Sequence, residues 1–193
     1  MRDIDVRLAV RSRLVAEHEG DADTRIVEEM GIWHGSVRID MAVINGSLSG
    51  YELKSERDTL DRLPVQAGLY SRVFDQLHLV AASKHMRHAE AEVPDWWGLI
   101  IAHGERDGVQ LELYRQPQQN PAVEAIQIAR LLWKEEALEL LEAADAARGV
   151  RSASREKVAL RLTEAFALPE LSAKVRRCLK DRQAWLGKPV CHQ

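Results

Sequence analysis

The alternation of apolar and polar residues predicts a helix, a three-stranded sheet and a second helix in the first part of the chain. The predicted elements are a helix over residues 3–18, strands over residues 24–32, 37–44 and 48–54, and a helix over residues 58–74. Apolar residues spaced three or four apart indicate the helices, and short runs rich in β-branched and apolar residues indicate the strands. The turn Asn45-Gly46-Ser47 is a strong hairpin signal, and Pro64 fits the first turn of the second helix. The strands are therefore expected to form an antiparallel meander between two helices.

The rest of the chain is predicted to add three strands and then a helical region. The three strands cover residues 77–82, 97–102 and 109–114, and the first of them is an apolar run that we place beside the meander. A polar, proline-containing segment over residues 116–121 marks a boundary. It divides the chain into a first domain of residues 1–118 and a helical domain of residues 119–193. The helices expected there are one long helix or a bent pair over residues 122–147, and two more over residues 154–166 and 169–186.

Ionisable residues interrupt two otherwise good strands, at Asp40, Glu52 and Lys54. Because side chains two apart on a strand point the same way, Glu52 and Lys54 share one face while Leu53 turns to the other. The hairpin brings Asp40 on the neighbouring strand within reach of that face. Two carboxylates and an ammonium group fit a site for Mg²⁺ or Mn²⁺, which prefers oxygen ligands and binds beside substrate phosphate. The simpler interpretation is a cross-strand salt bridge on a solvated face of the sheet.

These residues resemble the PD-(D/E)XK nuclease signature, in which an aspartate on one strand is followed by Glu-x-Lys on the next. Asp40 and the run Glu52-Leu53-Lys54 match that signature, and Gln66 with Tyr70 matches the Gln-x-x-x-Tyr motif of its RecB-like branch. Gln66 and Tyr70 are four residues apart, so they lie on one helical face. The predicted order αβββαβ is also similar to the family core. The resemblance implies an α/β, restriction-endonuclease-like fold with a central mixed sheet, followed by a C-terminal all-helical region.

The resemblance also implies a function, the metal-dependent hydrolysis of phosphodiester bonds, with DNA as the expected substrate. Asp40 and Glu52 would hold Mg²⁺ or Mn²⁺ together with an acidic residue upstream, for which Glu29 is preferred to Glu28. The metal would polarise the scissile phosphate and lower the pKa of an attacking water molecule.

Lys54, Gln66 and Tyr70 complete the catalytic set that the resemblance implies. Lys54 would orient the attacking water and stabilise the charge that develops on the phosphate. Gln66 would position Lys54 or the nucleic-acid backbone, and Tyr70 would support the site or contact a phosphate. Residues 24–80 are further similar to a group of small, largely uncharacterised bacterial and phage proteins of the same superfamily.

Charge is distributed unevenly along the chain. The net charge is −3, yet residues 121–193 carry 13 basic and 10 acidic side chains. A basic region of this kind can hold a phosphate backbone without reading its sequence, although a solvated helix face is the alternative. The candidate nucleic-acid contacts are Arg57, Arg62, Arg151, Arg155, Arg176 and Arg177. A homodimer or a partner protein is a further expectation, since a small nuclease that cuts both strands of a duplex often dimerises.

The sequence also bears on localisation and on the competing class of function. The first 20 residues mix charged with apolar positions, and no uncharged run reaches the roughly 20 residues of a membrane span. With only two cysteines, the pattern favours a protein of the reducing cytoplasm with no membrane partner. The competing class is a non-catalytic binding module that serves as a scaffold in DNA repair, recombination or defence complexes. A third class is a nuclease that stays silent until a partner delivers it to its substrate.

Overall fold

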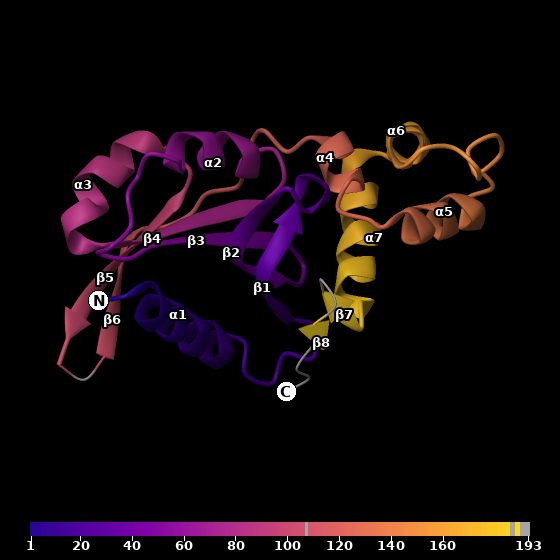
Figure 1. The fold of residues 1–193 in the computed structure, drawn as a ribbon. Coiled ribbons are helices and arrows are strands. Elements are labelled where there is room, and N and C mark those ends of the chain that lie inside the picture. The colour runs from indigo at the N-terminus through magenta and orange to yellow at the C-terminus, as the bar shows by residue number, and fades with distance from the viewer. Residues whose placement is uncertain (107, 186–187, 190–193) are drawn as a thin grey trace.

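A six-stranded sheet with the strand order β1-β2-β3-β4-β5-β6 organises the structure, a computed structural model (Figure 1). Residues 1–106, 108–185 and 188–189 are described. The strands are β1 (Arg25–Ile32), β2 (Val37–Ile44), β3 (Leu48–Lys54), β4 (Gln76–Ala82), β5 (Gly98–Glu105) and β6 (Gly108–Arg115). The helices among them are α1 (Asp3–Glu17), the 3-10 turn η1 (Trp33–Gly35), α2 (Leu63–Tyr70) and α3 (Ser83–Glu92).

The sheet is mixed, as the sequence predicts. β1, β2 and β3 pair antiparallel, β3, β4 and β5 pair parallel, and β6 returns antiparallel to β5. The tight turn at Asn45 joins β2 to β3, and its side-chain oxygen accepts a hydrogen bond from the Ser47 amide at 3.0 Å. The α/β class, the central mixed sheet and the element order αβββαβ are therefore confirmed.

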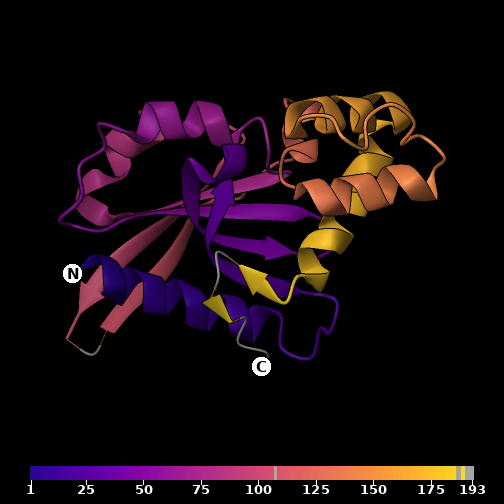
Figure 2. The same cartoon turned by 45° about the vertical axis from the view of Figure 1, so that its right-hand side comes forward.

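Helices cover both faces of the sheet, with α1 on one side and α2 and α3 on the other (Figures 1 and 2). Val6, Val10 and Leu14 recur every four residues on α1, so they form one stripe that is buried against Tyr51 and Leu53 of β3. The larger core lies on the opposite face and continues from the sheet into the C-terminal helices. Strand β3 is buried along its whole length because both layers cover it.

The helices of the first domain differ from the prediction in two ways. The second helix is shorter than expected and begins at Leu63, with Pro64 in its first turn. The residues before it form a turn in which the Asp58 carboxylate accepts hydrogen bonds from the amide and hydroxyl of Ser55, at 2.7 and 2.6 Å. The helix α3 was missed, because only Met86 and Ala89 of its ten residues are buried and its apolar pattern is weak.

The C-terminal region is mostly helical but not all-helical. Its elements are α4 (Ala125–Ala129), α5 (Lys134–Ala143), α6 (Arg155–Ala165), α7 (Leu168–Asp181) and the short strands β7 (Ala184–Trp185) and β8 (Lys188–Pro189). The single long helix over residues 122–147 is wrong and the bent pair is right, because α4 and α5 are separate helices. Leu131 and Leu132, in the link between them, are both buried. The last predicted helix is likewise too long, because β7 pairs with β8 after α7 ends. Ser154 caps α6 by accepting a hydrogen bond from the Lys157 amide.

Within the described residues, no helix combines the length and the apolar character that crossing a bilayer requires.

Candidate functional site

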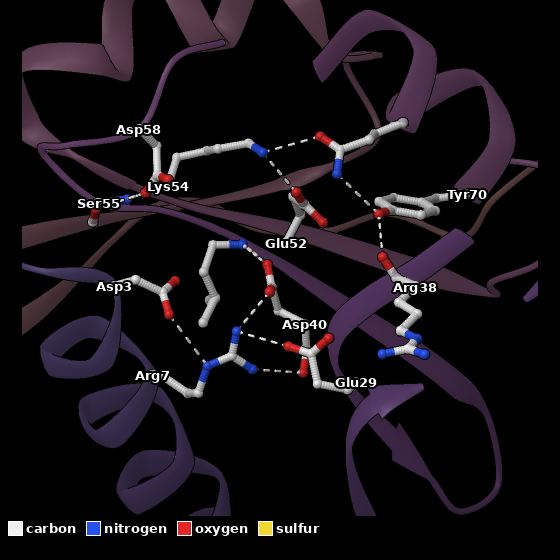
Figure 3. Close-up of polar contacts among 12 residues, drawn as sticks. Asp3, Arg7, Glu29, Arg38, Asp40, Glu52, Lys54, Ser55, Asp58 and Tyr70 are labelled. Carbon is white, nitrogen blue, oxygen red and sulfur yellow. Dashed lines mark hydrogen bonds and ion pairs between the residues drawn. The ribbon is translucent and has the colours of Figure 1, made fainter. Parts of the chain in front are cut away.

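Four of the predicted site residues form one hydrogen-bonded chain, which we call the Lys54 group: Glu52, Lys54, Gln66 and Tyr70 (Figure 3). Lys54 Nζ donates to Glu52 Oε1 at 2.7 Å and to Gln66 Oε1 at 3.0 Å. Gln66 Nε2 donates to the Tyr70 hydroxyl at 3.1 Å, and that hydroxyl donates to the Arg38 carbonyl oxygen at 2.7 Å. The chain is thus anchored at its far end to the main chain of β2.

Local geometry explains why these four residues meet. Glu52 and Lys54 are two apart at the end of β3, so both side chains rise on the face that α2 covers. Gln66 and Tyr70 are four apart on α2 and project from one side of that helix. Glu52 and Lys54 are only 3% and 5% exposed. A salt bridge on a solvated face of the sheet is therefore the wrong interpretation of this pair.

The Glu52 carboxylate is only partly satisfied. Its Oε2 atom is buried and accepts no hydrogen bond of normal geometry from the described residues, since the neighbouring Tyr70 hydroxyl donates to Arg38. Burial raises the pKa of Glu52, the nearby Asp40 carboxylate raises it further, and Lys54 opposes both effects. Burial likewise raises the pKa of the Tyr70 hydroxyl, which stays a neutral donor. A buried carboxylate oxygen without a donor is the kind of atom that a cation satisfies.

Asp40 belongs to a second set of charges, which lies toward α1 and which we call the Arg7 group: Asp3, Arg7, Glu29 and Asp40 (Figure 3). One guanidinium nitrogen of Arg7 contacts Asp40 Oδ1 at 2.8 Å and Glu29 Oε1 at 3.0 Å. A second nitrogen donates to the Asp40 carbonyl oxygen at 3.2 Å, and Nε lies 3.5 Å from Asp3 Oδ2. The other oxygen of Asp40 accepts the Leu53 amide at 2.8 Å, so Leu53 joins the two groups.

A break in the regular alternation of β1 and β2 turns Asp40 toward α1. Glu29 lies opposite Asp40, between the regular pairs Glu28↔Met41 and Met30↔Ile39, and has the left-handed φ of 52°. Backbone in this region costs a non-glycine residue on the order of 1–3 kcal/mol and persists only where the surroundings impose it. Burial raises the pKa of Asp40, against the effects of the Leu53 amide and Arg7.

The structure separates the two acidic candidates on β1. Glu29 reaches the Arg7 group, whereas Glu28 pairs with Arg11 of α1 at 3.2 Å. Among the described residues, no three His, Cys, Asp or Glu side chains lie close enough together to form a metal site. The donors fit Mg²⁺ or Mn²⁺ in kind, since Asp40, Glu29 and the unsatisfied Glu52 oxygen are all carboxylates. The metal site therefore stays a prediction, with Arg7 lying between two of its three expected ligands.

Three of the six arginines predicted to bind nucleic acid are engaged within the protein. Arg155 donates to the carbonyl oxygen of Leu132, in the link between α4 and α5, at 2.8 Å. Arg176 contacts Asp75 at 3.4 Å, and Arg151 pairs with a glutamate of α5 at 2.9 Å. The positive charge of the C-terminal region is therefore partly structural.

The side chains of Arg57, Arg62 and Arg177 form no hydrogen bond or ion pair with the described residues. Arg62 stands four residues before Gln66, so it extends the same face of α2. The sequence analysis missed Arg38, which is exposed at the start of β2, two residues before Asp40. Its position two residues before Asp40 on the same predicted strand could have indicated a residue near the site.

Comparison with known proteins identifies the family of the chain. A family model described as bacteriophage P4 protein cII matches residues 2–186. The chain belongs to the bacteriophage P4 protein cII family. Protein cII of Enterobacteria phage P4 is 28% identical to this cII-family chain over 95 residues, which are 49% of the chain and 36% of the relative. The match thus spans just over a third of the relative's length.

A solved structure of SfsA from Pyrococcus furiosus, in complex with Ca²⁺, is also similar to the chain. It is 15% identical, the similarity covers 62% of each chain, and the TM-score is 0.33. A likeness this low carries no argument about the site.

Proposed function

We propose that this cII-family protein is a divalent-metal-dependent nuclease of the PD-(D/E)XK type that hydrolyses phosphodiester bonds of DNA. The observation that supports the proposal most is the buried pair Glu52–Lys54. Two charges out of water cost more than their attraction returns unless further hydrogen bonds hold them. Gln66 supplies one such bond, to Lys54, and Tyr70 holds Gln66 in place. The Asp40 carboxylate is close enough to raise the pKa of Glu52. The buried pair is therefore held beside a second carboxylate, as a metal-dependent reaction requires.

Each residue has a defined role in this proposal. Asp40, Glu52 and Glu29 would hold Mg²⁺ or Mn²⁺, which when bound polarises a phosphate and lowers the pKa of water. Lys54 carries a positive charge at a fixed position, where it orients the attacking water and stabilises charge on the phosphate. Gln66 holds the Lys54 ammonium group through its side-chain oxygen. Tyr70 acts as a positioning residue, because its hydroxyl fixes the Gln66 amide.

Free guanidinium groups near the site fit a phosphate backbone. Arg38 lies two residues before Asp40 on β2, and Arg62 is the N-cap residue of α2, four residues before Gln66. Both are exposed and have no partner among the described residues, so neither has to give up an ion pair to bind a phosphate. Contacts of this kind position nucleic acid without reading its sequence.

A specific observation favours a second candidate, a catalytically silent module that binds nucleic acid or a partner protein. The carboxylates of Asp40 and Glu29 already share a cation, the Arg7 guanidinium. In that case the Lys54 group would only stabilise the fold. The protein would then bind DNA or its partner equally well with and without divalent metal.

Cleavage of supercoiled plasmid, linear duplex, single-stranded DNA and RNA separates the two candidates. The assays compare Mg²⁺, Mn²⁺ and EDTA for the wild type, Asp40→Asn and the double variant Glu52→Gln/Lys54→Met, which buries no charge. Glu28→Gln is the control, since Glu28 is the neighbouring carboxylate outside the site. We expect metal-dependent cleavage that falls at least about 100-fold in the first two variants and is kept in the control. No cleavage by the wild type, with DNA binding equal in all four proteins, would establish the silent module.

A further inference from the structure

We propose that Arg7 is an internal cation that competes with the divalent metal for the acidic site, an inference that rests on the proposed function. Metal loading then requires the Arg7 guanidinium to leave Asp40 and Glu29. Before metal binds, the Arg7 guanidinium occupies the place of the metal between the carboxylates. The metal then enters the site as the guanidinium moves out.

The oxygen atoms around the Arg7 guanidinium are of the kinds that bind a divalent metal. Four oxygen atoms surround it, three from carboxylates and one from a main-chain carbonyl, at 2.8–3.5 Å. Mg²⁺ and Mn²⁺ prefer oxygen atoms of these two kinds as ligands. A single nitrogen of Arg7 bridges Asp40 and Glu29. The guanidinium therefore occupies the position between two of the carboxylates that would hold the metal.

The charge of Arg7 lies between two carboxylates that would otherwise repel each other. Asp40 and Glu29 lie opposite each other on neighbouring strands, and two like charges in that position repel. A cation between them offsets this repulsion, and Arg7 provides it. The backbone of Glu29 is left-handed, and its carboxylate points toward Asp40 (Figure 3). The ion pair with Arg7 holds the carboxylate in that position. Arg7 thus preserves the shape of the site while it blocks the metal.

The packing of α1 determines how the exchange takes place. Val6, Val10 and Leu14 are buried in the smaller core, so the helix stays on the sheet when the polar contacts of Arg7 break. Arg7 lies at the margin of this contact with a side chain that is 14% exposed, and its long stem lets the guanidinium swing toward solvent. The exchange is therefore a movement of one side chain and needs no undocking of α1.

Arg11 offers a matched control on the same helix. It lies four residues after Arg7 and pairs with Glu28 at 3.2 Å, and both side chains are about 40% exposed. The same substitution at Arg11 removes a guanidinium and an ion pair from α1 without touching Asp40.

Mn²⁺ binding, followed by calorimetry and by electron paramagnetic resonance of the free ion, tests the exchange on the full chain. The proteins are the wild type, Arg7→Gln, Arg11→Gln and Asp40→Asn, with a thermal melt of each to confirm folding. We expect Arg7→Gln to tighten Mn²⁺ binding by about tenfold, Arg11→Gln to match the wild type and Asp40→Asn to abolish binding. Unchanged or weaker Mn²⁺ binding in folded Arg7→Gln would overturn the proposal.

A Mg²⁺ titration of ¹⁵N-labelled protein gives a second readout that needs no activity. The Nε–H signal of Arg7 is expected to shift as the site fills, while that of Arg11 stays in place. An Arg7 signal that does not move in a protein that binds Mg²⁺ and cleaves DNA would refute the exchange and leave the proposed function standing. If neither the wild type nor Arg7→Gln binds metal and no cleavage occurs, the proposed function and the exchange fail together.

Discussion

The Lys54 group and the Arg7 group lie on opposite sides of Leu53, and they differ in burial and in anchoring. Glu52 and Lys54 are almost fully buried and belong to a chain that ends on the main chain of β2. In the Arg7 group the side chain of Asp40 is 20% exposed and that of Glu29 is 43% exposed. Within the part of the chain that the structure describes, the guanidinium is held by carboxylate oxygens and one carbonyl oxygen. The first arrangement is fixed by its surroundings, and the second can exchange its cation with solvent.

Removing Lys54 gives the largest expected loss of stability. Lys54→Met leaves the buried Glu52 carboxylate without its partner, so we expect unfolding free energy at neutral pH to fall by about 3–5 kcal/mol. The double variant Glu52→Gln/Lys54→Met removes both charges and should recover most of that loss. Urea unfolding of the single and double variants measures both effects. A double variant as unstable as Lys54→Met would show that the charge pair is not the cause.

The buried histidine of β4 tests how completely α1 covers its face of the sheet. His78 stacks on Tyr51 with ring centroids 4.3 Å apart, and burial, aided by the charge of Arg13, lowers its pKa from 6.5 to about 4. Between those values the unfolded chain binds a proton that the folded protein excludes, so stability falls as the pH falls. The full effect is about 3 kcal/mol between pH 6.5 and 4. We expect unfolding measured against pH to show this decline, and His78→Phe to remove it while the slope from the carboxylates remains.

The far end of the Lys54 group is expected to contribute less. Tyr70→Phe removes the hydroxyl that binds the Arg38 carbonyl and the Gln66 amide, leaving both without this partner. The expected cost is about 1–3 kcal/mol of unfolding free energy. If the hydroxyl is a positioning group, cleavage by this variant should lose kcat with little change in KM. A variant with wild-type stability and wild-type kcat would contradict the anchoring that distinguishes the two groups.

Changes in the Arg7 group should have the smallest effect on stability. Arg7→Gln is expected to cost about 1 kcal/mol, because its ion pairs are partly open to solvent, and Arg11→Gln only a few tenths. Chemical unfolding at low and high salt measures both, and the Arg7 effect should shrink as salt screens the carboxylates. A loss for Arg7→Gln as large as that for Lys54→Met would show that the two groups do not differ in the way described.

The sequence predicts the two halves of the Lys54 group well because the geometry within each half is local. A spacing of two on a strand and of four on a helix places Glu52 with Lys54 and Gln66 with Tyr70. The hairpin turn at Asn45 then sets the register of β3.

The Arg7 group depends on two features that no local pattern reveals. The left-handed Glu29 breaks the alternation of β1, and the Asp40 side chain opposite it turns toward α1 and the Leu53 amide. The docking of α1 then brings Arg7 to Asp40 across 33 positions of sequence. Charge counting fails in a similar way in the C-terminal region, because it cannot distinguish a solvated guanidinium from Arg155, which binds a main-chain carbonyl.

Anomalous scattering from a crystal of the wild-type protein soaked in Mn²⁺ tests the central claim most directly, because it locates the metal without requiring a substrate. We expect one strong peak in contact with the carboxylates of Asp40 and Glu52, and an Arg7 guanidinium that has withdrawn from Asp40. A saturating soak that leaves Arg7 paired with Asp40, with no peak beside either carboxylate, would contradict the account.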